Sequence, residues 1–163
     1  MLIYLVQHAD ANKEDIDPSR SLSGKGLQDI KVVASYVSRL NIKVYKIFHS
    51  NKLRAKQTAE ILSENLKPTK GFSEVDGLAP LDDPNIWADR LKDIPDDIIL
   101  VGHLPHLGKL ASLLLSVGTD KNIISFKMAG IVCLKKNDAG EWSLQWMLTP
   151  EIVTGEKNSC DGL

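Results

Sequence analysis

Two histidines and an arginine stand where they could act together on a phosphoryl group. His8 and His103 each lie two residues after a continuous apolar run, and Arg54 lies near the start of a predicted helix that follows a third run. An imidazole nitrogen can attack phosphorus, while fixed positive charge and further donors stabilise the oxygens of the transferred group. If these three side chains converge, they supply the parts that phosphoryl transfer through a phosphohistidine requires.

The elements that precede these residues favour such a convergence. Residues 2–6, 44–48 and 97–101 are short apolar runs typical of strands, and the first and last suit a parallel sheet buried on both faces. In such sheets ligands bind beyond the carboxyl ends of the strands. The residue pairs 7–8, 49–50 and 102–103 follow the three runs, so three of the four histidines are expected at one edge of the sheet.

The rest of the pattern predicts an α/β fold, a three-layer sandwich whose mixed, mostly parallel sheet has helices on both faces. Apolar residues at steps of three and four, capped by Ser23, predict a helix over 24–40 whose buried stripe includes Leu27 and Leu40 and which Asn41 closes. Further helices are expected at 52–65, 85–91 and 105–117, and further strands at 123–127, 131–135 and 142–148. Residues 9–22 and 67–84 read as irregular, the latter with one short strand, and 137–140 form a hairpin turn.

The chain of 163 residues suits one domain, predicted at 1–153, followed by a polar tail at 154–163. Its 20 basic and 21 acidic residues nearly cancel and form no basic stripe, which argues against a nucleic-acid partner. No signal peptide or membrane-spanning stretch is recognisable, so a cytoplasmic location without membrane contact is expected. Cys133 reads as a buried apolar residue and Cys160 lies in the tail, which predicts neither a disulfide nor a metal site.

Three segments resemble successive motifs of the histidine phosphatase (phosphoglycerate-mutase-like) superfamily. They are residues 5–11, 50–59 and 101–108, and residues 20–26 together with the short length resemble its SixA-type phosphohistidine phosphatase branch. The resemblance extends over about residues 1 to 150 and implies that no cofactor is needed. By matching positions it implies that His8 becomes the phosphohistidine, its other ring nitrogen donating to a backbone carbonyl. It likewise implies that Arg54, Arg20 and His103 contact the phosphoryl oxygens.

Gln7 departs from the family signature, which reads Arg-His-Gly where this chain has Gln7, His8 and Ala9. Glutamine donates only neutral hydrogen bonds, so the change removes about 1–3 kcal/mol of phosphate stabilisation, or roughly one to two powers of ten in rate. Ala9 in place of glycine matters only if that backbone needs a positive φ. Gln7 is still expected to contact substrate.

The remaining candidates are each open to a structural interpretation. Asp82 and Asp83 are the loop carboxylates placed to protonate a leaving group, although solvated turn aspartates are the more ordinary interpretation. His49 either lines the pocket or ends a strand, and His106 is expected to be a rim or structural residue.

The scarcity of an acid favours a phosphohistidine substrate, since an imidazole leaving group needs less protonation than an alkoxide. The leading hypothesis is a phosphatase acting on phosphohistidine in a protein partner. The alternatives are a phosphatase of small phosphate esters, and a phosphate- or phosphoprotein-binding module that Gln7 has left catalytically weak.

Overall fold

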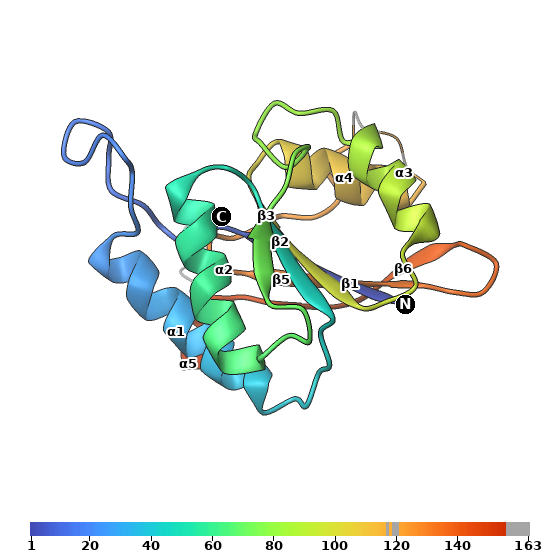
Figure 1. The fold of residues 1–163 in the computed structure, drawn as a ribbon, viewed down its shortest axis with the longest axis horizontal. Helices are drawn as coiled ribbons and strands as arrows, with labels where there is room; N and C mark the ends of the chain where they lie inside the picture. The colour runs from blue at the N-terminus through green and yellow to red at the C-terminus, as the bar shows by residue number, and fades with distance from the viewer. Residues whose placement is uncertain (117, 119–120, 156–163) are drawn as a thin grey trace, which may run out of the picture.

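The computed structural model describes residues 1–116, 118 and 121–155, which build a six-stranded sheet between two layers of helices (Figure 1). The strand order is β3-β2-β4-β1-β5-β6. The strands are β1 (Leu2–Gln7), β2 (Lys46–His49), β3 (Phe72–Glu74), β4 (Ile98–Gly102), β5 (Ile131–Lys136) and β6 (Trp142–Leu148). The helices are α1 (Gly24–Ser38), α2 (Leu53–Leu66), α3 (Asn85–Asp93), α4 (His106–Leu114) and α5 (Pro150–Thr154).

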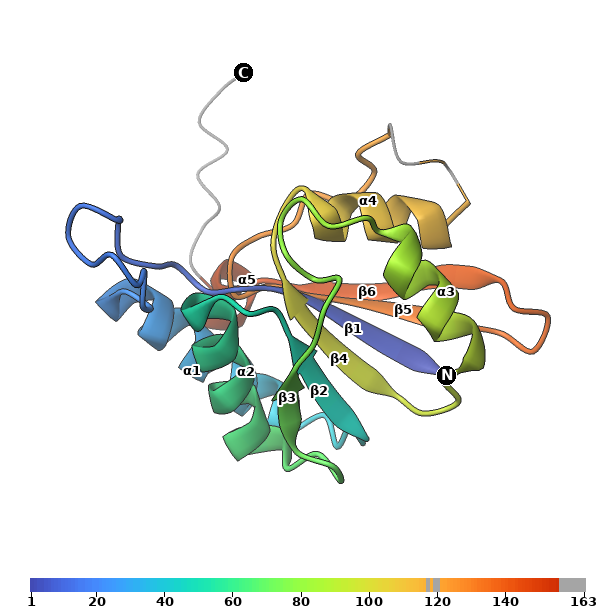
Figure 2. The ribbon, with the colours of Figure 1, turned by 45° about the horizontal axis from the view of Figure 1, so that its top comes forward.

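Alternation along the strands divides the core into two halves (Figure 2). Tyr4 and Val6 of β1 face α1 and α2, whereas Ile3 and Leu5 face α3 and α4. β1 is therefore buried on both faces, as its unbroken apolar sequence predicts. The predicted α/β three-layer fold with a mostly parallel sheet is confirmed: β3, β2, β4 and β1 run parallel, and β5 and β6 pair antiparallel.

The parallel pairing aligns the carboxyl ends of three strands. Gln7 of β1 is opposite Gly102 of β4, and His49 of β2 is opposite Val101. Hydrogen bonds continue this alignment past the strands, from His8 N to the Gly102 carbonyl at 3.1 Å and from Ser50 N to the Val101 carbonyl at 3.2 Å. The three strand-end pairs expected at one edge do lie together.

Three sequence predictions need correction. Residues 123–127 form no strand and pair with neither edge of the sheet; Ile124 and Phe126 instead bury their side chains against the α3–α4 face. α1 ends at Ser38, and Leu27 and Leu40 are exposed rather than part of its buried stripe. Asn41 lies beyond the helix in a left-handed conformation with φ 52°.

The C-terminal region also differs from the prediction. Thr149 caps the short helix α5, whose Val153 packs on the core. The sequence analysis did not predict this helix, although Thr149 followed by Pro150 is a pattern typical of a helix start. The helix predicted over 105–117 is too long, because α4 ends at Leu114 and Ser116 has a left-handed φ of 59°. Val117, and residues 156–163 of the predicted tail with Cys160, lie outside the described residues. Cys133 is buried, as predicted, and burial raises the pKa of its thiol to about 12. No helix within the described ranges is long and apolar enough to cross a membrane.

The loop between β1 and α1 projects beyond the helices and is visible in blue at the left of Figure 1. A bridge between Ala11 and Leu22 closes its base, and the Asp17 carboxylate accepts hydrogen bonds from the backbone and hydroxyls of Ser19 and Ser21. These bonds hold the pKa of Asp17 well below its usual value. Arg20 sits in this ordered turn with φ 50°.

Gly26 allows the first turn of α1 to pack against the chain leaving β1. A Cβ on Gly26 would lie 2.0 Å from the Asp10 carbonyl oxygen, whereas a Cβ on Gly24 of the same helix would meet nothing within 4 Å. We expect Gly26→Ala to lower the free energy of unfolding by at least about 2 kcal/mol, since backbone must move. Gly24→Ala is the matched control and should raise it by up to about 1 kcal/mol. Urea unfolding measures both, and equal effects of the two variants would contradict the close approach.

Candidate active site

His8 lies at the carboxyl end of β1, and each of its ring nitrogens has a hydrogen-bond partner. Its Nδ1 is 2.7 Å from the Ala9 carbonyl oxygen, which can only accept, so Nδ1 carries the proton of the neutral ring. Nε2 then presents a lone pair, and Arg54 Nε donates to it at 3.2 Å. Ala9 is absent from the residues with positive φ, so alanine is unstrained where the family signature has glycine.

Arg54 is held against His8 by a side chain that the sequence analysis did not single out. The buried Thr58 hydroxyl donates to the Arg54 carbonyl at 2.7 Å and accepts from Ala9 N at 3.0 Å. One hydroxyl thus joins the first turns of α2 to the backbone that follows His8. The spacing of Thr58 four residues after Arg54 places both on one helix face, but only the tertiary structure shows the contact with Ala9.

His103 follows β4, and its ring centroid lies 4.9 Å from that of His8. Its Nε2 is 2.5 Å from the Ser50 hydroxyl oxygen, a contact that the sequence analysis also missed. Its Nδ1 is buried and has no hydrogen-bond partner among the described residues. Buried polar atoms are seldom left unpaired, so this nitrogen is available to a ligand.

The electrostatics of the site keep both imidazoles neutral. Burial, followed by the charges of Arg54 and Arg20, lowers the pKa of His8 to about 4 against the opposing bond to Ala9. Burial also lowers the pKa of His103 to about 3, aided by His8 and by the charges of Arg54 and Lys52. A neutral His8 retains the lone pair that a nucleophile needs.

Arg20 and Gln7 complete the surroundings of His8. Arg20 Nε donates to the Asn12 carbonyl at 3.3 Å, and the charge of Arg20 acts on both His8 and Arg54. Gln7 Oε1 is buried without a partner in the described part of the chain. The structure therefore brings together His8, Arg54 and His103 at the carboxyl edge, with Arg20 within electrostatic reach and Gln7 one residue before His8.

The carboxylates of Asp82 and Asp83 accept hydrogen bonds from nearby residues of the same segment. Asp82 Oδ2 accepts from Ala79 N at 2.8 Å, and Asp83 Oδ1 accepts from the backbone and side chain of Asn85 at the start of α3. The bonds from Asn85 lower the pKa of Asp83, whereas a general acid needs a raised one. These contacts match the ordinary interpretation of turn aspartates.

The other two histidines have different surroundings. His49 Nδ1 lies 2.8 Å from the Ser50 carbonyl and its ring packs against Phe72, which suits the end of a strand. His106 is fully buried at the start of α4, and neither ring nitrogen has a partner in the described ranges. Burial lowers its pKa, while the charges of Asp82 and Asp83 oppose that shift.

Comparisons with known proteins agree with this geometry, although no protein-family model matches the chain. An uncharacterised protein of Picosynechococcus sp. strain PCC 7002 is 34% identical over 147 residues, which span 85% of this chain and 87% of that protein. Phosphohistidine phosphatase SixA of Escherichia coli strain K12 is 21% identical over 155 residues, spanning 92% and 94%. The solved structure of the protein histidine phosphatase SixA complexed with tungstate superposes with a TM-score of 0.82 at 21% identity, covering 92% of this chain and 97% of that one. The chain has the fold of the SixA histidine phosphatase.

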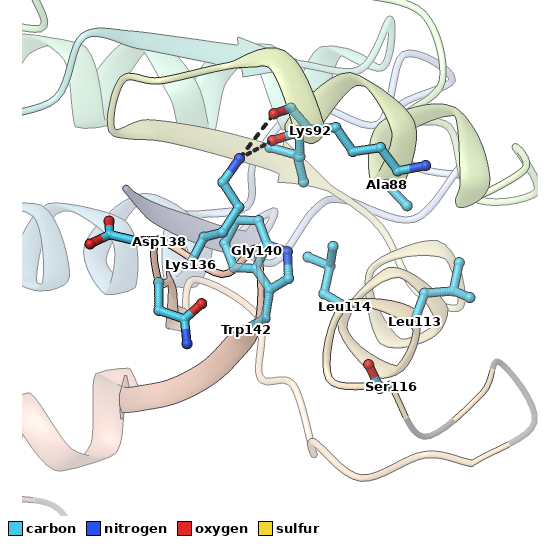
Figure 3. Close-up of a pocket in the computed structure, with 11 residues that line it drawn as sticks. Ala88, Lys92, Leu113, Leu114, Ser116, Lys136, Asp138, Gly140 and Trp142 are labelled. Atoms are coloured by element: carbon cyan, nitrogen blue, oxygen red, sulfur yellow. Dashed lines mark hydrogen bonds between the residues drawn. The ribbon is translucent and has the colours of Figure 1, made fainter.

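A separate cavity of about 460 Å³ lies at the opposite edge of the sheet (Figure 3). It is lined by the ends of α3 and α4 and by the β5–β6 hairpin, near the amino end of β1. Lys136 reaches across it and donates to the carbonyls of Leu91 and Lys92, which caps the end of α3 (Figure 3). Among the described residues, no group of three or more metal-binding side chains is present there or elsewhere.

The lowered pKa values make the stability of the fold depend on pH. Between pH 6.5 and about 4 the unfolded chain binds more protons at His8 and His103 than the folded chain, so the free energy of unfolding falls as the pH falls. Each histidine contributes at most about 1.4 kcal/mol per pH unit. Urea titrations at pH 7 and pH 5 measure the loss, which His103→Asn should reduce. Equal stability of the wild type at the two pH values would refute the buried neutral pair.

Proposed function

We propose that this chain is a phosphatase that hydrolyses phosphohistidine in a protein partner through a covalent phosphohistidine on His8. The observation that carries the proposal is the pair of contacts at His8: Nδ1 donates to Ala9, and Nε2 faces the guanidinium of Arg54. This arrangement fixes the tautomer and holds the lone pair beside a permanent positive charge.

The reaction follows from these contacts. Nε2 of His8 forms a bond to phosphorus as the P–N bond of the substrate breaks, and the leaving imidazole keeps that electron pair and takes up a proton from solvent. Water then attacks phosphorus and gives a proton back to solvent, the bond to Nε2 breaks with its electron pair returning to Nε2, and inorganic phosphate leaves with the ring neutral again. Arg54, Arg20 and His103 stabilise the oxygens in both steps.

The choice of phosphohistidine rests on the leaving group. An alkoxide must be protonated as it departs, and the candidate acids Asp82 and Asp83 are held by Ala79 and Asn85. An imidazole departs with less help, which favours a phosphoramidate over a sugar phosphate. The similarity to the phosphohistidine phosphatase SixA supports the same choice.

The first test is the release of phosphate from a phosphohistidine-bearing protein and from an aryl phosphate. We expect the wild type to hydrolyse the phosphoprotein faster, and His8→Ala to lose more than about 1,000-fold in rate because the nucleophile is gone. His49→Asn is the matched control: His49 also donates through Nδ1 to the next carbonyl, and asparagine keeps a donor there. Preference for the aryl phosphate would favour the small-ester alternative, and activity in His8→Ala would exclude the covalent route.

Gln7 supports the second candidate, a phosphate-binding module. Its Oε1, buried and without a partner among the described residues, brings no charge where the family signature has arginine. We expect Gln7→Arg to raise kcat/KM by about 10- to 100-fold, and Gln7→Lys to raise it less because lysine lacks the planar fork. Steady-state kinetics with the phosphoprotein measure both variants. Tungstate binding without phosphate release, in the wild type and in Gln7→Arg alike, would instead establish the binding module.

A further inference from the structure

The Ser50 hydroxyl is hydrogen-bonded to one ring nitrogen of His103. The two residues follow neighbouring parallel strands, β2 and β4, and both are almost fully buried. The Ser50 hydroxyl oxygen lies 2.5 Å from His103 Nε2, whereas its contact with Lys52 N is long, at 3.4 Å. The bond to the imidazole is therefore the main interaction of this hydroxyl.

The direction of this hydrogen bond decides what His103 offers at its other nitrogen. His103 is neutral, so it carries one proton. If Nε2 held that proton and donated to Ser50, Nδ1 would present a lone pair, which repels an anionic oxygen. If Ser50 donates to Nε2, the proton lies on Nδ1, the buried atom that lacks a partner in the described residues, and Nδ1–H can donate to a ligand.

We propose that Ser50 is a positioning residue that donates a hydrogen bond to His103 Nε2. This bond holds His103 in the tautomer whose Nδ1–H donates to the phosphoryl oxygens. The inference rests on the proposed function, since only an anionic group on Nδ1 requires this tautomer. Ser50 acts through His103 and needs no contact with substrate. His8 holds the same Nδ1–H tautomer, but there the Ala9 carbonyl accepts the proton and it is the unprotonated Nε2 that meets Arg54. Two neutral imidazoles 4.9 Å apart thereby serve as nucleophile and donor.

The tautomer can be read directly from the ¹⁵N chemical shifts of the ring nitrogens in long-range ¹H–¹⁵N spectra. The chain has four histidines, and the His103→Asn spectrum assigns the signals of His103 by their loss. We expect the wild type at pH 7 to show His103 protonated on Nδ1, and Ser50→Ala to show a mixture of tautomers. Ser112→Ala is the matched control, because it removes another buried serine hydroxyl, which bonds to the Lys121 carbonyl, and should leave His103 unchanged.

Kinetics and tungstate binding then link the tautomer to the reaction. We expect Ser50→Ala to lower kcat about 10-fold or more, with a smaller change in KM, because the donor matters most for the charge of the transition state. Tungstate affinity should fall as well, and Ser50→Thr, which keeps the hydroxyl, should restore the tautomer and most of the rate. Thermal unfolding of each variant separates these effects from loss of the fold.

The outcomes distinguish this inference from the proposed function. A wild-type His103 protonated on Nε2, or a Ser50→Ala variant that keeps the Nδ1 tautomer and wild-type tungstate affinity, overturns the role of Ser50. If the wild type hydrolyses neither substrate, the proposed function fails, while the spectra and tungstate binding still decide whether Ser50 sets the tautomer.

Discussion

The hydrogen-bonded register of β1, β4 and β2 determines where the polar residues that follow these strands lie. Gln7 pairs with Gly102 and His49 with Val101, so three strands end within one residue of each other. Side chains alternate between faces along a strand, so a slip of one residue would exchange the two faces and misplace the residues that follow. The apolar runs of β1 and β4, buried on both faces, make such a slip costly. The register that builds the core thus also brings His8 and His103 together.

The site has a cost that the rest of the fold must offset. The two imidazoles are kept neutral by burial, and His103 Nδ1 and Gln7 Oε1 have no partner among the described residues. A buried polar group without a hydrogen bond costs about 1–3 kcal/mol. Such unpaired atoms are retained where a ligand completes their hydrogen bonds, so this energetic cost falls at the place where an anion would bind. Hydrogen bonds from Ser50 and Thr58 hold the surrounding groups rigid, so little further ordering is needed on binding.

The sequence predicts the part of the site that depends on local pattern. His8 and His103 follow from the rule that ligands bind beyond the carboxyl ends of parallel strands, and the sheet and most helices follow from apolar periodicity. Ser50 and Thr58 could not be assigned their contacts in this way. Their partners, His103 and Ala9, are 53 and 49 residues distant, so their hydrogen bonds depend on the tertiary register. The strand predicted at 123–127 is wrong for a related reason: Ile124 and Phe126 are apolar because they pack on the α3–α4 face, not because they pair in the sheet.

Gln7 separates two functions that an arginine beside the nucleophile would combine. A positive charge there would lower the pKa of His8 and would also bind phosphoryl oxygens. The first function is redundant in this chain, because burial is the largest cause of the lowered His8 pKa and Arg54 and Arg20 add to it. His8 Nε2 therefore stays unprotonated, with its lone pair free of a proton, even without a cation at position 7. In the proposed reaction, glutamine would withdraw stabilisation of the charge on the transferred phosphoryl group. That role would then belong to Arg54, Arg20 and the Nδ1–H of His103. Because the charge at His8 comes from α2 and the β1–α1 loop, the Thr58 bridge that ties α2 to Ala9 becomes more important to this site.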